Sequence, residues 1–369
     1  MSQRAPGDPD RASADRGAGS RAPNGSGGPP VASPLTEPAD AALDRALAPY
    51  DFQLPDDAIA RHPPAERDGG RLLVVGPPHD DRRVVDLAEL LEPGDLLVVN
   101  DVFVHHARLR ARRDSGGNVE VLLAGGGEAL VRPARRLREG EVLACGPGHV
   151  RLDARLGDGR WRVTCLPDMD TLTRAAGEIP LPPYFERAPT AEDEERYQTV
   201  FAKRAGDLRG AAAPTAGLHL SPRVLAALDA RGVRRATVTL EVGLGTFRPL
   251  GIEQIEAGAL HAERYVVPEE TWEAVRTAKR VVAVGTTVAR TLESARGPGP
   301  GSTRLFIRDA YRFRRVNLLF TNFHLPRSSL LMLVCAFGGR ERVLDAYRHA
   351  VRGGYRFYSY GDAMLVGPG

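Results

Sequence analysis

The sequence predicts an α/β protein: a large α/β domain with a mixed or barrel-like sheet, into which a small antiparallel β-barrel is inserted. Outside residues 102–176, short apolar runs alternate with helical segments, which is typical of α/β folds. Inside that range, apolar and polar residues alternate with period two between Gly-rich turns, which indicates antiparallel strands. We therefore predict a discontinuous large domain at 45–101 and 177–369 and a barrel at 102–176.

The first 44 residues have a different composition from the rest. They hold no aromatic residue and are dominated by Gly, Pro, Ala, Ser, Asp and Arg, so they cannot bury enough apolar surface to offset the entropy of ordering. We predict a disordered N-terminal tail. It has no continuous apolar stretch of the kind that a secretory signal needs.

We expect a cytoplasmic protein with no membrane-spanning segment, and we expect a monomer. The longest apolar run, Leu330 to Phe337, is far shorter than the roughly 20 residues that cross a bilayer. Three cysteines without metal-type spacing favour reduced thiols. The nine histidines show no HExxH or comparable pattern, so we predict no metal.

Helices and strands of the large domain follow from apolar periodicity and from Pro, Gly and Ser at their ends. Residues 50–61 contain a plausible helix start, and a Gly/Pro turn is expected just before residue 305. The predicted strands are 71–75, 96–100, 236–242, 281–284, 305–307 and 316–320, with a last strand ending in YGDAMLV, and the predicted helices are 86–91, 222–231, 268–280, 286–295, 328–337 and 341–352. In the barrel, strands are predicted around 119–123, 150–156 and 161–165.

Polar residues follow several of these strands. Thr321, Asn322 and His324 come after the strand at 316–320, and similar clusters follow other strands at 214–219, 243–248, 285–290 and 359–362. In α/β proteins, ligands bind at the carboxyl edge of the sheet, where such residues gather. The alternative is structural, with Asn322 as a turn former and His324 as a hydrogen-bonded core histidine.

Positive charge is concentrated in the barrel region. The net charge of the chain is +3, but residues 108–162 hold twelve Arg against seven Asp and Glu. This asymmetry is compatible with a polyanion such as a nucleic acid. The alternative is that Arg is simply the usual surface cation here, since the chain has only two lysines, Lys203 and Lys279.

Five motifs in order resemble the S-adenosylmethionine:tRNA ribosyltransferase-isomerase family of the queuosine pathway. They are AAPTAGLHL (212–220), GLGTFRPL (243–250), VGTT with RTLES (284–294), TNFHLPRSSLLMLV (321–334) and YRFYSYGDAMLV (355–366). The runs YDFQLP, PAERDGGRLLVV and GDLLVVND are also similar to that family, so the resemblance covers residues 50–366. It implies a large α/β domain with an inserted small barrel.

The resemblance implies a reaction that uses S-adenosylmethionine as a co-substrate. Its ribosyl part is transferred to a 7-aminomethyl-7-deazaguanine base in tRNA and isomerised to give epoxyqueuosine, while adenine and methionine leave. Such chemistry needs a base to remove a proton next to sulfur and an acid to assist the departure of adenine. It also needs a pocket for the sulfonium ion and an anchor for the amino-acid end.

Candidate residues lie within or beside the matched motifs. The catalytic candidates are His219, His261, His324 and Glu263, because imidazole titrates near working pH and Glu263 can orient a histidine or act itself. Arg248 or Arg290 is expected to hold the methionine carboxylate, and aromatic or acidic residues are expected at the sulfonium. The predicted cofactor-binding set is Thr215, Gly217, Gly243, Gly245, Thr246, Phe247, Arg248, Gly285, Thr286, Thr287, Arg290, Asn322, Phe323, Tyr360 and Asp362.

The chain departs from the family pattern at Val102, Phe103, His106, Glu241 and Asn317. These changes alter recognition chemistry more than fold. They leave two enzymatic hypotheses open: the tRNA enzyme itself, or a relative that uses S-adenosylmethionine on a small-molecule acceptor. A tRNA-binding protein without catalysis is the third hypothesis, and the intact histidine motifs disfavour it. GLGTFR is not a GxGxxG fingerprint, so a nicotinamide cofactor is not expected.

Overall fold

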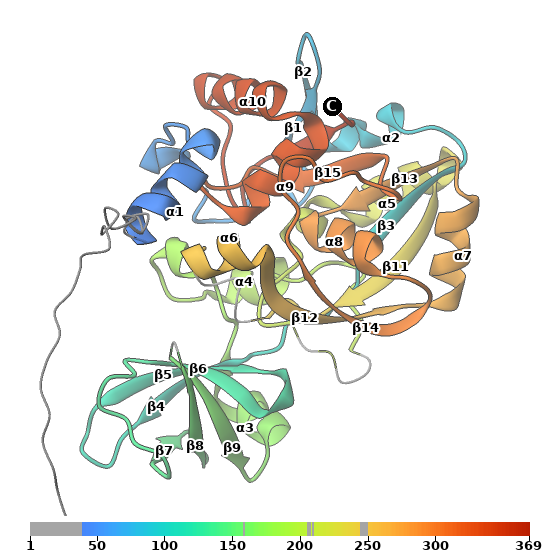
Figure 1. Ribbon diagram of the computed structural model, residues 1–369. Coiled ribbons are helices and arrows are strands. Elements are labelled where there is room, and N and C mark those ends of the chain that lie inside the picture. The colour runs from blue at the N-terminus through green and yellow to red at the C-terminus, as the bar shows by residue number, and fades with distance from the viewer. Residues whose placement is uncertain (1–38, 158, 205–207, 209, 244–249) are drawn as a thin grey trace, which may run out of the picture. The chain divides into compact units, whose positions relative to one another are not determined.

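A computed structural model describes residues 39–157, 159–204, 208, 210–243 and 250–369. Two sheets organise these residues (Figure 1). The larger sheet has the strand order β14-β12-β11-β3-β13-β15-β16-β1-β2. In that order the strands span Gly299–Leu305, Ala259–Val267, Arg234–Leu240, Asp95–Asn100, Arg280–Val284, Leu318–Asn322, Ala363–Val366, Arg71–Val75 and Asp80–Arg83. The predicted α/β fold with a mixed sheet is confirmed.

The direction of the strands changes along this sheet. The four central strands, β11, β3, β13 and β15, are mutually parallel. Strand β16 runs antiparallel to β15, and β1 is parallel to β16. The outer pairs β11–β12, β12–β14 and β1–β2 are antiparallel.

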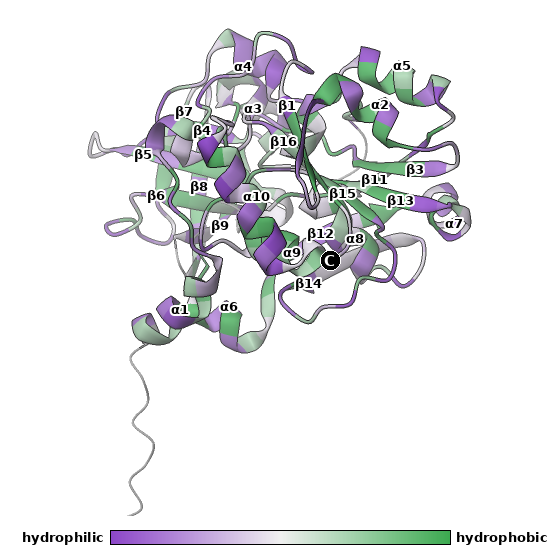
Figure 2. Ribbon diagram, turned by 90° about the horizontal axis from the view of Figure 1, so that it is seen from above, coloured by the Kyte–Doolittle hydropathy of each residue, from purple (hydrophilic) through white to green (hydrophobic). Residues whose placement is uncertain are grey.

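Both faces of the large sheet are buried, because successive side chains of a strand point to opposite sides. Val281 and Ala283 of β13 enter one core cluster, whereas Val282 and Val284 enter another. Figure 2 shows β3, β13 and β15 as largely hydrophobic ribbons, which matches their burial on both faces. This accounts for the continuous apolar runs that predict these strands.

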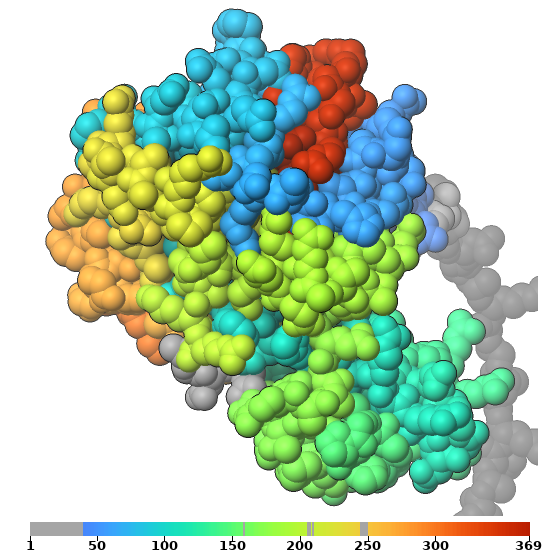
Figure 3. All heavy atoms as spheres, turned by 180° about the vertical axis from the view of Figure 1, so that it is seen from behind, coloured from blue at the N-terminus to red at the C-terminus, as the bar shows by residue number. Residues whose placement is uncertain are grey.

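Helices cover both faces of the sheet. Helices α2 (Leu87–Leu90) and α5 (Pro222–Ala230) contribute to one core cluster, and α8 (Thr286–Ser294), α9 (Ser329–Gly338) and α10 (Arg340–Arg352) contribute to the other. The remaining helices are α1 (Ala39–Leu47), α3 (Met169–Ala176), α4 (Ala191–Arg196), α6 (Ile252–Ala257) and α7 (Glu269–Thr277). In Figure 3, α10 lies beside β1 and β2, where the His349 side chain contacts Asp81 at 2.9 Å.

The smaller sheet closes into an antiparallel barrel. Its strands are β4 (Arg108–Arg112), β5 (Asn118–Ala124), β6 (Glu128–Arg132), β7 (Val142–Cys145), β8 (Gly148–Gly157) and β9 (Arg160–Leu166), with the short β10 (Gly177–Glu178) added to β4. Closure comes from the pairing of Arg112 in β4 with Ala144 in β7. Trp161 is buried in its core. That this barrel is a separate domain with bounds 102–176 stays a prediction.

Several predicted boundaries were wrong. Helix α1 starts at Ala39, inside the segment predicted to be disordered, because Leu47 is buried and Leu43 packs against the main core. Residues 1–38 of that segment lie outside the described residues. The predicted Gly/Pro turn is confined to bends at 296–298, and the strand predicted at 305–307 instead spans Gly299–Leu305 as β14, which tolerates Pro300 because it is the edge strand of the sheet. Where a helix start was predicted at 50–61, the structure has two 3-10 turns, Ala48–Tyr50 and Asp56–Ala58.

Candidate active site

The candidate site lies at the carboxyl edge of the large sheet. Strands β3, β11, β13 and β15 all end there because they are parallel. Because β16 runs antiparallel to β15, and β1 parallel to β16, the segments that precede these two strands reach the same edge. The topology therefore brings four segments to this carboxyl edge of the sheet: Gly285–Thr287, Thr321–His324, Ser359–Asp362 and residues 67–70.

His219 is the most enclosed of the candidate histidines. It ends the 3-10 helix η6 (Thr215–His219) and is 3% exposed, and its ring meets that of Phe320 edge-on. The Nε2 atom lies 3.0 Å from Nδ2 of Asn322. Burial, together with the positive charges of Arg356 and Arg67, lowers the pKa of His219 from 6.5 to about 4. The imidazole is therefore neutral near pH 7.

His324 occupies a different environment. Its Nε2 atom is 3.0 Å from the hydroxyl of Thr321, and its backbone N–H donates to the Tyr347 hydroxyl at 2.9 Å. Burial lowers the pKa of His324 to about 4. Thr321 and Asn322 are neighbours on β15, so their side chains point to opposite faces of the sheet. The structure therefore holds His219 and His324 on different sides of this strand and does not bring them together.

Glu263 and Arg290 form a buried ion pair. Their side chains are 9% and 7% exposed, and Nη1 of Arg290 contacts the carboxylate of Glu263. Nε of Arg290 donates to the Leu305 carbonyl at 3.1 Å, while its Nη2 atom is buried without a hydrogen-bond partner. His261 lies two residues before Glu263 on β12 and is half-buried. Two of the three guanidinium nitrogens of Arg290 thus have partners within the protein, and the third is left to bind a ligand.

The turn after β13 approaches η6 closely. Gly285 has a φ of +90°, donates its N–H to the Phe320 carbonyl at 2.8 Å and immediately precedes α8. A Cβ atom at this position would lie 3.5 Å from the Cβ of Ala216. Thr286 is buried, and the Thr287 hydroxyl is buried without a partner. This turn therefore offers an unsatisfied hydroxyl at a helix N-terminus, which favours anionic groups.

Two further glycines differ in what surrounds them. A Cβ at Gly217 would come within 2.8 Å of the Phe201 ring, so the absence of a side chain there is required by packing inside the protein. Gly243 is half-buried, and its nearest neighbour would be the Glu263 side chain at 3.9 Å. Thr215 is half-buried at the start of η6.

Three predicted ligand-binding side chains make internal contacts. Phe323 is fully buried in a cluster of aromatic rings. The Tyr360 hydroxyl donates to Asp193 at 2.9 Å. The carboxylate of Asp362 accepts the backbone N–H groups of Arg71 and Arg356 at 2.8 and 2.7 Å. These contacts give each of the three side chains a partner within the protein. Their roles at a sulfonium ion stay a prediction that these contacts do not support.

Four candidates, Gly245, Thr246, Phe247 and Arg248, lie outside the described residues. In the parts of the chain that the structure does describe, no group of three or more His, Cys, Asp or Glu side chains is arranged to hold a metal ion. No described helix is both long and apolar enough to cross a membrane.

Sequence reasoning missed two residues at this edge. Arg67 donates from Nη1 to the carbonyls of Gln198 and Leu218, at 2.9 and 3.2 Å, and so fixes η6. Asp68 is buried and accepts from the Ser221 hydroxyl and from Arg223. Both belong to the run PAERDGG, which carries part of the resemblance. Their place at the site becomes clear only from the direction of β1.

The residues that depart from the family pattern have structural partners. Val102 is fully buried. Oδ1 of Asn317 accepts the Val281 N–H at 2.8 Å, at the end of the sheet opposite the candidate site. His106 contacts Glu194 at 2.5 Å, Glu241 accepts from Arg264 at 2.8 Å, and Phe103 stacks under the Arg204 guanidinium at 4.3 Å.

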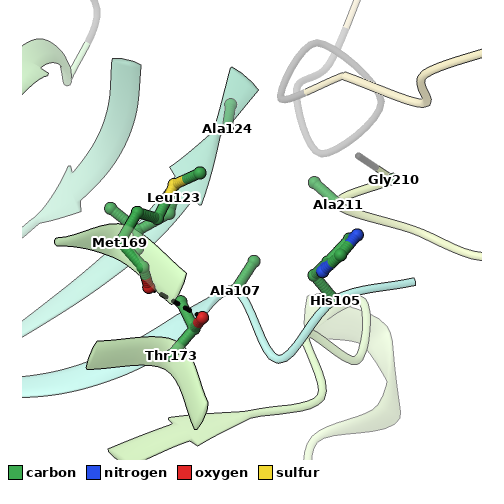
Figure 4. Close-up of a pocket in the computed structure, with 8 residues that line it drawn as sticks. All are labelled: His105, Ala107, Leu123, Ala124, Met169, Thr173, Gly210 and Ala211. Carbon is green, nitrogen blue, oxygen red and sulfur yellow. Dashed lines mark hydrogen bonds between the residues drawn. The ribbon is translucent and has the colours of Figure 1, made fainter. Parts of the chain in front are cut away.

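A small pocket lies away from these residues, where the barrel meets residues 210–211 (Figure 4). Most of its lining is apolar. None of the candidate residues lines it, and its Thr173 hydroxyl donates to the carbonyl of Met169 at 2.8 Å. The residues around it are His105, Ala107, Leu123, Ala124, Met169, Thr173, Gly210 and Ala211.

Comparison with known proteins assigns the family. The sequence model of the family described as "Queuosine biosynthesis protein" matches residues 47–366. This chain belongs to that family. A relative from Rubrobacter xylanophilus, named S-adenosylmethionine:tRNA ribosyltransferase-isomerase, is 52% identical over 329 residues, which cover 86% of this chain and 96% of the relative. One from Anaeromyxobacter dehalogenans (strain 2CP-C) with the same name is 50% identical over 343 residues, covering 87% and 99%.

A solved structure described as S-adenosylmethionine tRNA ribosyltransferase from Thermotoga maritima is 36% identical, covers 86% of this chain and 99% of its own, and gives a TM-score of 0.49. The match to the queuosine biosynthesis family takes in every motif that carries the resemblance. The family assignment from sequence is confirmed. Residues 1–46 lie outside the matched range.

Proposed function

We propose that this protein is an S-adenosylmethionine:tRNA ribosyltransferase-isomerase. It transfers the ribosyl part of S-adenosylmethionine to 7-aminomethyl-7-deazaguanine in tRNA and isomerises it to epoxyqueuosine, with release of adenine and methionine. The observation that carries this proposal is the identity of about half of all residues to relatives of that name over nearly their full length. We propose that the reaction takes place in the cytoplasm.

The carboxyl edge of the large sheet has groups suited to this substrate. In the first two turns of α8, the unpartnered hydroxyl of Thr287 and Nη2 of Arg290 are both donors, as the methionine carboxylate requires. Gly285 precedes α8 and uses its own N–H on the Phe320 carbonyl, whereas Thr286 begins the helix and contributes to its N-terminal N–H groups. We place the amino-acid end of S-adenosylmethionine here.

The candidates for the base are His219, His261, His324 and Glu263. The carboxylate of Glu263 is already engaged by the guanidinium of Arg290. His324, with its pKa lowered to about 4, is neutral and can accept a proton at working pH. We therefore favour a histidine over Glu263 and assign to Glu263 the positioning of Arg290.

The second enzymatic hypothesis, transfer to a small-molecule acceptor, has less support. It rests on the departures from the family pattern. Of these, Val102 belongs to the core and Asn317 precedes β15 at the opposite end of the sheet, so neither alters the candidate site. Relatives named for tRNA match this chain at 50% identity or more.

The proposal is tested by adenine release. Purified protein is incubated with S-adenosylmethionine and with tRNA that carries 7-aminomethyl-7-deazaguanine, and adenine is measured by chromatography. We expect release only when the modified tRNA is present. The control is the same tRNA with guanine at that position. Adenine release that is independent of the modified base would support the small-molecule hypothesis and contradict ours.

A further inference from the structure

The contacts of Asn322 fix which of its amide atoms faces His219. One amide atom lies 3.0 Å from the Tyr358 carbonyl and 3.0 Å from Nε2 of His219. A carbonyl oxygen only accepts hydrogen bonds, so this atom must be the amide nitrogen. The opposite orientation of the amide would place two oxygens against each other. Asn322 therefore donates one hydrogen to Tyr358 and has its second hydrogen for His219.

This orientation determines where His219 carries its proton. Nε2 of His219 receives a hydrogen bond from Asn322, so it presents a lone pair. In a neutral imidazole the other nitrogen, Nδ1, then holds the hydrogen. A protonated ring would place an N–H against the N–H of Asn322. The environment of the ring thus opposes protonation at Nε2 for a reason separate from burial.

The Tyr358 carbonyl is itself held in place. Tyr358 has a φ of +75°, an uncommon conformation for a residue with a side chain. Its N–H donates to the Phe323 carbonyl at 3.1 Å, and its carbonyl also accepts the Gly361 N–H at 3.0 Å. Because the backbone on both sides of Tyr358 is fixed, the orientation of the Asn322 amide is fixed as well.

The Nδ1 side of His219 faces Gly70. A Cβ atom built on Gly70 would lie 3.4 Å from Nδ1 and 3.5 Å from Oδ1 of Asp362. Asn322 is only 2% exposed, and its Oδ1 atom is buried without a hydrogen-bond partner. Leaving a buried acceptor without a hydrogen bond destabilises the folded protein. A ligand that donates a hydrogen bond to this atom would remove that cost.

We propose that Asn322 is a positioning residue that holds His219 in the neutral tautomer protonated at Nδ1, and that it offers its own Oδ1 atom to an N–H or O–H donor on S-adenosylmethionine. His219 then serves the reaction as a hydrogen-bond donor through Nδ1, and it is not the base. This inference rests on the proposed function for the identity of the ligand. The tautomer follows from the hydrogen bonds alone.

The tautomer is tested by nuclear magnetic resonance of protein with 15N-labelled histidine, with His219→Gln used to assign the signals. We expect the Nδ1 signal of His219 to be that of a protonated nitrogen and the Nε2 signal that of an unprotonated one. In Asn322→Asp, a carboxylate oxygen replaces the donor, so we expect the hydrogen to move to Nε2. An Nε2-protonated ring in the unmodified protein would overturn the inference.

Kinetics test the role of His219 as a donor. The amide nitrogen of Asn can occupy the place of Nδ1, whereas that of Gln reaches the place of Nε2. We therefore expect His219→Asn to keep adenine release within about tenfold, and His219→Gln to lose roughly a hundredfold or more, as when one transition-state donor is removed. If His219 is the base instead, both variants lose the roughly 10² to 10⁴ that a general base contributes. Equal losses in the two variants would overturn the proposal.

Asn317→Asp is a matched control for Asn322→Asp. Both residues belong to the β15 region, and Asp at 317 keeps the acceptor oxygen for the Val281 N–H. We expect Asn322→Asp to lower adenine release by about a hundredfold or more. The control should retain both adenine release and melting temperature. Adenine release by Asn322→Asp at the rate of the control would contradict the role of Asn322. If Asn322→Asp does not fold, the proposal is still tested by the comparison of His219→Asn with His219→Gln and by the 15N spectrum of the unmodified protein.

The donor that meets Oδ1 of Asn322 can belong to the adenine amine or to a ribose hydroxyl. Binding of adenine and of adenosine to unmodified and Asn322→Asp protein separates the two sources. Weaker binding of both ligands to the variant assigns the amine, and weaker binding of adenosine alone assigns the ribose. Unchanged binding of both would overturn the ligand contact. If the unmodified protein releases no adenine with modified tRNA, the proposed function fails, while the spectrum still tests the tautomer.

Discussion

At the scale of single residues, His219 links the chemistry of the site to the stability of the protein. Its pKa is about 4 in the folded protein and near 6.5 when exposed, so between these values the unfolded chain binds the extra proton more strongly. Folding stability from this group is complete above pH 6.5 and is lost as the pH falls toward 4. The difference between the two pKa values corresponds to roughly 3 kcal/mol of unfolding free energy.

We therefore expect the unfolding free energy of the unmodified protein to fall more steeply between pH 6.5 and 4.5 than that of His219→Gln. Denaturant titrations at several pH values, run on both proteins, measure this difference. Carboxylates that titrate in the same range contribute equally to both and cancel. Parallel pH profiles would mean that His219 is not buried in its neutral form.

The sequence could predict which residue types gather at the strand ends, but not which of their atoms are already engaged. Asn322 and His219 come from motifs about 100 positions apart, and their contact depends on the path of η6. Phe323 is the neighbour of Asn322 in the same motif, yet it points into the core. Adjacent side chains on a strand differ in this way because they face opposite sides, and the sequence does not say which side holds the ligand.

At the scale of secondary structure elements, Glu293 joins α8 to the segment that leads into β15. Its buried carboxylate accepts the backbone N–H groups of Arg314, Arg315 and Val316, at distances from 2.8 to 3.1 Å, and the Tyr311 hydroxyl at 3.2 Å. A single side chain thereby satisfies the backbone of an entire turn. In Glu293→Gln, an amide N–H₂ group replaces one of the accepting oxygens.

We expect Glu293→Gln to lower the unfolding free energy by about 2 to 4 kcal/mol, because buried donors lose a charged partner. Glu273→Gln is the control, since Glu273 pairs with Arg276 on an exposed surface and should change stability by less than about 1 kcal/mol. Thermal and chemical unfolding of both variants give the comparison. Similar losses in the two would show that Glu293 does not hold this turn.

Elements with clear periodicity were predicted well, and those that depend on their neighbours were not. Helix α5 has the predicted cap, in which the Ser221 hydroxyl accepts the Val224 N–H at 3.1 Å. Strand β14 differs from the predicted turn, because Gly and Pro disfavour strands in isolation. Its pairing with β12 decides its conformation, and that pairing is a property of the folded sheet.

At the scale of the whole molecule, the arginines of the barrel differ in whether an acidic side chain already pairs with them. Arg110, Arg113, Arg151 and Arg160 pair with acidic side chains. A second group, at the end of β6 and in the segment after it, is exposed, and its side chains have no ion-pair partner within the described part of the chain: Arg132, Arg135, Arg136 and Arg138. If the barrel contacts tRNA, this second group supplies the contacts to phosphates.

We expect alanine at Arg135 and Arg136 together to weaken tRNA binding and to lower the salt slope of its affinity by about one for each phosphate that the variant no longer neutralises. Arg151→Ala, which removes an arginine already paired with Asp153, should leave that slope nearly unchanged. Filter binding over a range of salt concentrations measures both. Equal slopes in all three proteins would place the tRNA elsewhere.

Fold class could be predicted from the sequence because the period of the apolar pattern changes at the barrel. Strand order could not, because β16 is inserted between β15 and β1, and no local signal records that placement. The direction of β1 and β16 is what brings Arg67, Gly70 and Asp362 to the candidate site. The sequence therefore predicted that polar residues follow these strands, but not how they are arranged, and their roles stay a prediction.

The insertion of β16 has a consequence for synthesis on the ribosome. Leu72 of β1 pairs with Ala363 of β16, about 290 positions later in the chain. Until β16 has left the ribosome, β15 and β1 each present an open, apolar edge, which is the kind of surface that associates wrongly or recruits chaperones. Contacts between such distant segments also form slowly. A nascent chain therefore cannot assemble this site early, and substrate binding begins only after β16 joins the two halves of the sheet.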